Sequence, residues 1–315
     1  MNLMDGDPLI GLLSRFRENV EGVLLGKREA VDLALASFLA GGHILLEDVP
    51  GTGKTTLARA LSAGISGTFR RIQFTSDLLP QDILGVHILD AERKSFVFSP
   101  GPLFANIVLA DEINRSNPRA QSALLEAMSE RQVTLDNRTY PLPEPFLVIA
   151  TQNPHEQHGT YPLPESQLDR FNLRLRLDYP DRESELVLLR ESNLLTVRDG
   201  IPPTLSTGHM RALRDAVGRV TVRDSVLDYI QRIAAGTRLH PAIRLGASPR
   251  GAIGLKSTAQ ALALLSGRDH VTPEEVRQVA PAVLCHRLFP RGAAAGTEAA
   301  RAILDEVLDA VPAPL

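Results

Sequence analysis

Short apolar runs alternate with longer amphipathic stretches over the first 180 residues of the chain. The apolar runs are typical of strands, and they lie at residues 44–46, 71–74, 107–110, 146–151 and 173–177. Before the first run, apolar positions recur at helical spacing over residues 27–40 and predict a helix, and further helices are predicted between the runs at 55–63 and 118–130. Strands that alternate with helices are typical of βαβ units around a mainly parallel sheet. The first part of the chain is therefore predicted to be an α/β domain.

Two of these runs differ in how they are expected to be covered. The run 107–110 is apolar throughout, as a strand buried on both faces should be. The run 173–177 alternates Leu with Arg, which predicts an edge strand with one solvated face.

Two further segments predict hairpins inserted into this core, at about residues 84–102 and 132–145. The first contains a β-rich piece that ends in Pro100-Gly101-Pro102, and in the second two short runs flank Asp136-Asn137-Arg138. A surface hairpin without a function is the alternative for each, and the sequence alone does not decide between them.

The pattern changes after Tyr179-Pro180, where the chain becomes rich in Ala, Leu and Arg and mainly helical. One helix is predicted over residues 182–195, followed by a break at 200–203. Thr272-Pro273-Glu274-Glu275 predicts a helix start, with Thr as N-cap, Pro in the first turn and two acidic residues behind it. We therefore expect an α/β core at residues 1–180 and a small all-α domain at 181–315.

Composition narrows the functional class without fixing it. The chain has 315 residues, 43% of them hydrophobic, and its net charge of −3 gives no general argument for nucleic acid or an anionic membrane as partner. The first residues are acidic where a secretory signal would be basic, and the longest apolar stretch is short for a membrane span. The single cysteine, Cys285, excludes an internal disulfide and is expected to be a packed core thiol. We expect a cytoplasmic protein with no membrane span.

The segment from Asp48 to Thr55 has the composition of a phosphate-binding loop between a strand and a helix. Gly51 and Gly53 allow backbone N–H groups to approach phosphate oxygens, and the helix N-terminus behind them adds partial positive charge. Lys54 supplies a positive charge for the β- and γ-phosphates, and the Thr55 hydroxyl can bind Mg²⁺. The usual pattern begins with Gly where this chain has Asp48, so a chance Gly-rich turn stays open on the loop alone.

Polar side chains follow two other predicted strands. Asp111 ends the strand at 107–110 in the position that holds Mg²⁺ in P-loop enzymes, and Glu112 beside it can polarise an attacking water. Asn153 follows the strand at 146–151 and can hydrogen-bond the γ-phosphate or the same water. A strand-ending acidic pair and an Asn-Pro turn are the alternatives without chemistry.

Two arginines and a histidine pair complete the candidates. Arg170 precedes the predicted edge strand, well placed for a neighbouring subunit, although a lone arginine is more often a surface ion-pair partner. Arg250 lies in the helical part and can report nucleotide state, which is a weak signal by itself. His155 and His158 have a metal-like spacing but no evident third ligand, which favours a solvated polar loop.

Together these motifs resemble the AAA+ ATPases, and most closely the MoxR family. The segments that carry the resemblance are residues 47–55, 110–115, 150–154, 168–171 and 246–250. It implies a P-loop NTPase core with a five-stranded parallel sheet and a small all-α lid domain. It also implies that the two hairpins are the helix-2 insert and the pre-sensor-1 hairpin of this clade, and that Asp48 is a tolerated variation.

The resemblance assigns roles to individual residues. Contacts to ATP or ADP are implied for Leu25, Gly26, Val49, Pro50, Gly51, Thr52, Gly53, Lys54, Thr55, Thr56, Asp111, Glu112, Asn153 and Arg250. Catalytic roles are implied for Lys54, Glu112, Asn153 (sensor 1), Arg170 (arginine finger) and Arg250 (sensor 2), and Mg²⁺ ligation for Thr55 and Asp111.

The implied function is an ATPase that remodels or matures a protein client. A head-to-tail contact that closes makes a ring, and we expect a hexamer. The family further implies a von Willebrand factor A-domain partner, often in metal insertion. A nucleic-acid motor is the first alternative, disfavoured because acidic residues balance the basic ones on both hairpins. A non-hydrolysing nucleotide-gated scaffold is the second, disfavoured by the presence of Glu112, Asn153 and Arg170.

Overall fold

The computed structural model describes residues 7–48, 51–90, 92, 94–153, 160–190, 201–292 and 296–314. Within these residues a five-stranded sheet has the order β2-β5-β8-β1-β9, and every neighbouring pair is parallel. Its strands are β1 (Ile44–Glu47), β2 (Phe69–Gln73), β5 (Ile107–Asp111), β8 (Leu147–Gln152) and β9 (Leu173–Leu175). The predicted α/β core with a parallel sheet is confirmed.

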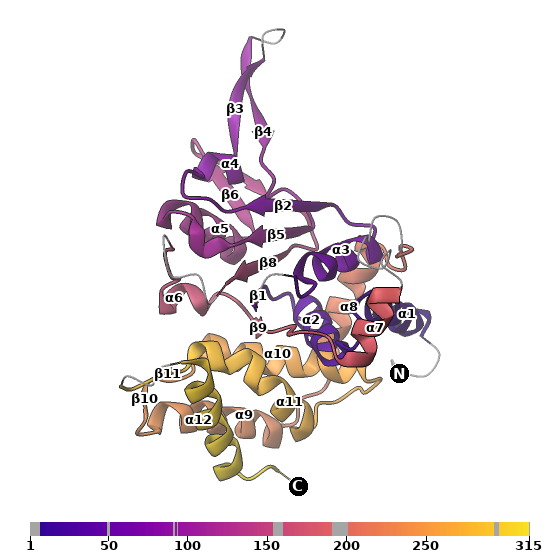
Figure 1. The fold of residues 1–315 in the computed structure, drawn as a ribbon, viewed down its shortest axis with the longest axis vertical. Helices are drawn as coiled ribbons and strands as arrows, with labels where there is room; N and C mark the ends of the chain where they lie inside the picture. Colours follow the sequence, from indigo (N-terminus) through magenta and orange to yellow (C-terminus); the bar gives the residue numbers. More distant parts are fainter. Residues whose placement is uncertain are drawn as a thin grey trace.

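Helices cover both faces of the sheet (Figure 1). Alternate strand residues divide between two hydrophobic clusters, as the period of a strand requires. One cluster joins Leu45, Val108 and Val148 to the helix α5. The other joins Ile44, Leu109 and Ile149 to helices on the opposite face. The helices of this core are α1 (Pro8–Val23), α2 (Arg28–Leu39), α3 (Lys54–Gly64), α4 (Pro80–Leu84), α5 (Pro118–Glu130) and the short α6 (Glu165–Leu168).

Both predicted hairpins are present. One pairs β3 (Gly85–Asp90) with β4 (Ser95–Pro100), and the other pairs β6 (Gln132–Leu135) with β7 (Arg138–Pro141). The β3–β4 hairpin extends beyond β2 and away from the body of the molecule (Figure 1).

Of the remaining described α-helices, the last four pack below the sheet in Figure 1, whereas the first two lie beside α1 and α2. In chain order these helices are α7 (Arg182–Arg190), α8 (Thr207–Arg219), α9 (Asp224–Leu239), α10 (Pro249–Leu265), α11 (Pro273–Leu284) and α12 (Thr297–Ala310). The predicted helix start at Thr272 is confirmed, because its backbone N–H donates to Glu275 Oε2 at 2.8 Å. The end of the helix predicted at 182–195 lies outside the described residues. A short antiparallel pair, β10 (Ile243–Leu245) with β11 (Phe289–Pro290), was not predicted.

The expectation of a solvated face on the edge strand is wrong at Arg174. Its side chain is only 13% exposed, and its Nη1 lies 3.4 Å from Glu47 Oε2. Helix α11 packs against β9 and covers it, which the alternation of Leu and Arg could not indicate. Nearby Cys285 is buried, and burial raises the pKa of its thiol to about 11, so the expected core thiol is confirmed. No described helix has the length and apolarity needed to cross a membrane.

Two buried histidines make the stability of this fold depend on pH. His43 Nδ1 accepts from the Val148 backbone N–H at 3.0 Å, so its Nε2 carries the proton that faces the Met128 carbonyl at 3.1 Å. Burial lowers the pKa of His43 to about 4. Burial also lowers the pKa of His286 to well below its ordinary value. Both imidazoles are therefore neutral in the folded protein near neutral pH.

We expect the free energy of unfolding to fall as the pH drops from about 7 to about 5. The unfolded chain takes up protons at these histidines near its ordinary pKa, whereas the folded chain does not, so acid favours unfolding. His43 alone should contribute about 2 kcal/mol of this loss. Urea denaturation at the two pH values measures the free energy of unfolding. A His43→Gln variant should lose about 2 kcal/mol less of it between pH 7 and pH 5 than the wild type. Equal pH dependence in the variant and the wild type would contradict the assignment.

Candidate active site

The carboxyl ends of β5, β8 and β1 meet at one edge of the sheet, where a cavity of about 360 Å³ opens. Its described lining comprises Gly51, Gly53, Lys54, Thr55, Thr56, Arg71, Asp111, Glu112, Thr151 and Asn153. The sheet order explains this gathering, since the three strands are neighbours and their ends coincide. All of these residues except Arg71 and Thr151 are predicted from the sequence to belong to the site.

The loop after β1 has the backbone that a phosphate cradle needs. Gly51 and Gly53 have φ of +86° and +99°, a region that side-chain-bearing residues rarely adopt. Helix α3 begins directly after Gly53 and leaves its first N–H groups without partners inside the helix. Lys54 Nζ donates to the Asp48 carbonyl at 2.8 Å, and burial lowers the pKa of this ammonium group. Val49 and Pro50 lie outside the described residues.

Asp48 has a structural role that a glycine in its place could not have. Its Oδ2 accepts from the backbone N–H groups of Leu177 and Asp178, both at 2.8 Å. The carboxylate thus ties the start of the loop to the chain that follows β9. Asp48, which departs from the usual loop pattern, thus links the chain after β1 to the chain after the neighbouring strand β9.

Thr151 orients both acidic residues at the end of β5. Its hydroxyl donates to Asp111 Oδ1 at 2.5 Å and accepts from the Glu112 backbone N–H at 2.8 Å. Glu112 has a φ of +56°, an uncommon conformation for a residue with a side chain. This pair of hydrogen bonds fixes Asp111 and Glu112 relative to the end of β8.

Side chains from β2 reach both carboxylates. Arg71 Nη2 lies 2.5 Å from Asp111 Oδ2, and Gln73 Nε2 donates to Glu112 Oε2 at 2.8 Å. Arg71 Nη2 also donates to Gln73 Oε1 at 3.2 Å, and Arg115 Nη1 donates to Glu112 Oε2 at 2.9 Å. The two β2 residues are two positions apart and therefore lie on one face of the strand. The sequence pattern gave no sign of them, because their contacts depend on the β2–β5 register.

Comparison with known proteins agrees with this geometry. The family model described as "ATPase family associated with various cellular activities (AAA)" matches residues 43–173, and the AAA lid domain model matches residues 235–307. Chaperone MoxR1 of Mycobacterium tuberculosis is 40% identical over 317 residues, which cover 96% of this chain and 82% of that protein. The chain belongs to the MoxR family of AAA+ ATPases.

Other relatives extend over the same length. Protein MoxR of Paracoccus denitrificans is 33% identical over 88% of this chain and 89% of that protein. A crystal structure from Cytophaga hutchinsonii, described as a candidate ATPase, has a TM-score of 0.89 at 38% identity, covering 98% of this chain and 96% of that one. The predicted family, fold and ATPase activity are thereby confirmed.

Several residues implied by the MoxR resemblance are not in the described lining of the cavity. Arg170 Nη1 donates to the Leu125 carbonyl at 2.8 Å and to Ser129 Oγ at 3.2 Å, against the end of α5. Arg250 is exposed in the first turn of α10. Their assigned roles stay predictions.

The segment implied for adenine contact packs elsewhere. A side chain at Gly26 would meet Ser184 Oγ at 2.6 Å, at the start of α7, while Leu24 lies beside Gly53. The roles of Leu25 and Gly26 therefore also stay predictions. His155 and His158 lie outside the described residues, and among the described ones no cluster of three or more His, Cys, Asp or Glu is placed to hold a metal ion.

Oxygen atoms suitable for Mg²⁺ line the cavity, namely the Asp111 carboxylate and the Thr55 hydroxyl. Arg71 already holds Asp111 Oδ2, so a cation there must share that oxygen with the guanidinium group. We expect Arg71→Ala to lower the Mg²⁺ concentration needed for ADP binding, because the guanidinium group no longer competes for Asp111. The change should be only about two- to fivefold, since Arg71 is 49% exposed and solvent screens its attraction to Asp111. Titration of a fluorescent ADP analogue with Mg²⁺ measures this, with the exposed Arg70→Ala as matched control. An unchanged Mg²⁺ requirement would show that Arg71 does not compete.

Proposed function

We propose that this MoxR-family protein couples hydrolysis of Mg-ATP to the remodelling of a protein client, as a hexameric ring in the cytoplasm. The supporting observation is the β3–β4 hairpin, which extends from the core and exposes apolar side chains. Phe96 is 69% exposed, Leu89 63% and Ile88 52%. Leu89 lies opposite Phe96 on one face of the hairpin, and exposed apolar groups placed side by side are typical of surfaces that bind other proteins.

In this proposal the described cavity holds the phosphates. Lys54 and the N–H groups at the start of α3 bind the β- and γ-phosphates, and Thr55 with Asp111 would hold Mg²⁺. A bound Mg²⁺ draws charge from the phosphate oxygens. Glu112 takes a proton from the attacking water, and Asn153 orients that water or the γ-phosphate. Arg170 of the adjacent subunit stabilises the charge that develops in the transition state.

The same proposal gives a route from the nucleotide to the hairpin. Gln73 bonds Glu112 at the end of β2, and the chain continues through α4 directly into β3. On this stretch the Leu78 carbonyl accepts from Asn117 Nδ2 at 2.8 Å, which joins it to the start of α5. A change at Glu112 on hydrolysis therefore reaches the apolar hairpin through one hydrogen bond and the short stretch of chain from β2 to β3.

Affinity isolation tests the proposal. The Glu112→Gln variant, which should bind ATP without turning it over, is held in Mg-ATP in a lysate beside a Lys54→Ala variant, which should bind ATP poorly. A protein client is expected only with Glu112→Gln, and the purified client should change the turnover of the wild type. Retention of the same proteins by both variants, or none, would contradict client remodelling.

The finer part of the proposal is a von Willebrand factor A-domain partner that serves metal insertion or enzyme maturation. It rests on the family, and the isolation experiment tests it if such a partner is retained together with the client. A nucleic-acid motor would need basic side chains along the hairpin, whereas Asp90 and Glu92 accompany Lys94 near its tip. DNA affinity that falls steeply with salt would overturn the client proposal in favour of that function.

A further inference from the structure

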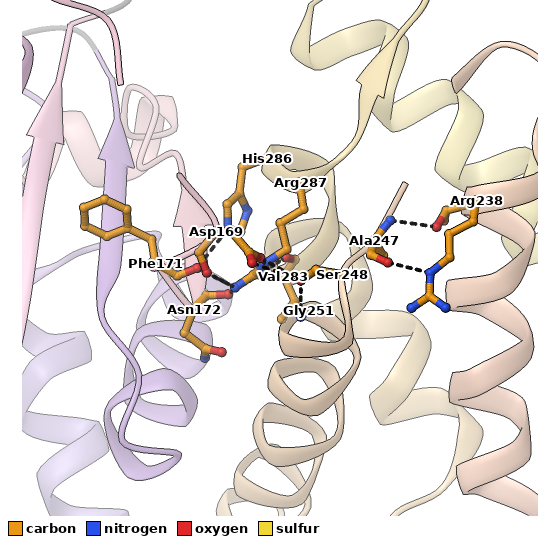
Figure 2. A network of polar contacts seen from close by, with 11 residues as sticks. Asp169, Phe171, Asn172, Arg238, Ala247, Ser248, Gly251, Val283, His286 and Arg287 are labelled. Atoms are coloured by element: carbon orange, nitrogen blue, oxygen red, sulfur yellow. Dashed lines mark hydrogen bonds and ion pairs between the residues drawn. The ribbon is translucent and has the colours of Figure 1, made fainter. Parts of the chain in front are cut away.

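One buried arginine of the helical part, Arg287, hydrogen-bonds residues on both sides of Arg170. We call the hydrogen bonds from Arg287 to residues 169–172 the Arg287 clasp. Arg287, in the short helix η3 (Cys285–Arg287), has a side chain only 3% exposed. Its Nε donates to Asp169 Oδ1 at 2.7 Å, and its Nη2 donates to the Phe171 carbonyl at 2.6 Å (Figure 2). Further bonds join it to the carbonyls of Asp169 and Asn172 at 3.3 and 3.0 Å, and to that of Val283 in α11.

These contacts use the whole hydrogen-bonding capacity of the group. A guanidinium has five N–H donors, and five acceptors surround it among the described residues. Four of the acceptors belong to residues 169–172, the segment that contains Arg170. A lysine has three donors on one atom and cannot hold the same set.

The Asp169 carboxylate extends the clasp to α10. Ser248 Oγ donates to it, 3.0 Å from each oxygen, and accepts from the Gly251 backbone N–H as the N-cap of the helix. Figure 2 shows Ser248, Asp169 and Arg287 joined by these hydrogen bonds. Arg250 is the second residue of α10 and lies two positions after Ser248, which bonds Asp169, the residue before Arg170.

Close packing at this junction depends on a small residue. A side chain at Gly251 would lie 2.9 Å from Arg287 Cδ. His286 adds a contact of 3.0 Å from its Nε2 to the Phe171 carbonyl, and Nε2 is the donor because a carbonyl oxygen only accepts. The segment that carries Arg170 is thus fixed to the helical part from two directions.

We propose that Arg287 is a positioning residue that, with Asp169 and Ser248, couples the segment carrying Arg170 to the helical domain. The inference rests on the proposed role of Arg170 as a finger for the adjacent subunit. Movement of α10 in one subunit then advances or withdraws the finger at the next nucleotide. The clasp converts a local domain movement into control of the neighbouring active site.

Arg287→Lys tests this in purified, assembled protein. We expect kcat to fall about tenfold or more with nucleotide affinity within about twofold of wild type, since the variant's own phosphate cavity is untouched. Mixing with Glu112→Gln, whose finger is intact, should restore turnover, whereas mixing with Arg170→Ala should not. A double Arg170→Ala, Arg287→Lys variant should be no slower than Arg170→Ala alone. Arg301→Lys changes an exposed arginine of α12, is the matched control and should leave kcat unchanged.

The outcomes separate this inference from the finger role. Full turnover by Arg170→Ala would exclude the proposed role of Arg170 as an arginine finger. A slow Arg170→Ala beside an Arg287→Lys of wild-type kcat would overturn the positioning role alone, as would additive losses in the double variant. If Arg287→Lys does not fold, Ser248→Ala decides, with an expected fall in kcat of about two- to fivefold at unchanged nucleotide affinity. Wild-type kcat in Ser248→Ala would then overturn the inference.

Discussion

Replacing Glu112 by Gln should slow ATP turnover by about 10²–10⁴-fold while nucleotide affinity stays within about twofold of wild type. The carboxylate lines the cavity beside Asp111. In the proposed mechanism it takes a proton from the attacking water. The amide has the same size and retains an oxygen acceptor for Gln73 Nε2 and Arg115 Nη1, which bond the carboxylate now. The substitution therefore removes basicity with little change of shape.

Steady-state phosphate release and equilibrium binding of a fluorescent ATP analogue measure the two quantities separately. Glu126→Gln makes the same chemical change on the exposed face of α5 and should leave both unchanged. Rapid turnover by Glu112→Gln would exclude Glu112 as the base. Loss of binding in place of turnover would show that its role is to hold the nucleotide.

Local patterns were sufficient for the elements that carry the cavity. The predicted order of a short strand, a glycine-containing loop and a helix is present, with Gly51 and Gly53 at positive φ directly before α3. Strand β5 ends in Asp111, and Asn153 directly follows β8, as the apolar runs at 107–110 and 146–151 predicted. Carboxyl ends of parallel strands share one edge, so their meeting follows from the sheet alone.

Contacts that depend on register or on packing between domains were not predictable from local pattern. Arg71 and Gln73 reach the carboxylates because β2 pairs with β5 so that Gln73 lies opposite Asp111. Arg174 is covered because α11 packs on β9, which strand alternation does not encode. The Arg287 clasp joins residues more than a hundred positions apart and has no signature in either segment. Sequence motifs thus indicated the candidate catalytic residues, whereas the residues that contact and orient them became apparent only in the tertiary structure.

Arg170→Ala should reduce turnover by about 10³-fold or more, a loss typical of removing an arginine that stabilises phosphoryl transfer. In the described cavity of the same chain Arg170 is absent from the lining, and its Nη1 bonds the Leu125 carbonyl and Ser129 Oγ. If Arg170 takes part in catalysis, it must therefore act at the active site of another subunit. Ser129→Ala is the matched control, because it removes one contact of Arg170 within the chain and should leave turnover unchanged.

Mixed rings decide whether Arg170 acts across the subunit boundary. A subunit with Arg170→Ala has an intact Glu112, and a subunit with Glu112→Gln has an intact Arg170, so the first regains a complete site beside the second. Phosphate release should recover partially in the mixture and should not recover when both changes are in one chain. If every mixture stays inactive, the arginine serves its own chain, and the bond to α5 becomes its function. Recovery would mean that each active site in the ring is completed by its neighbour, which makes turnover a property of the assembly.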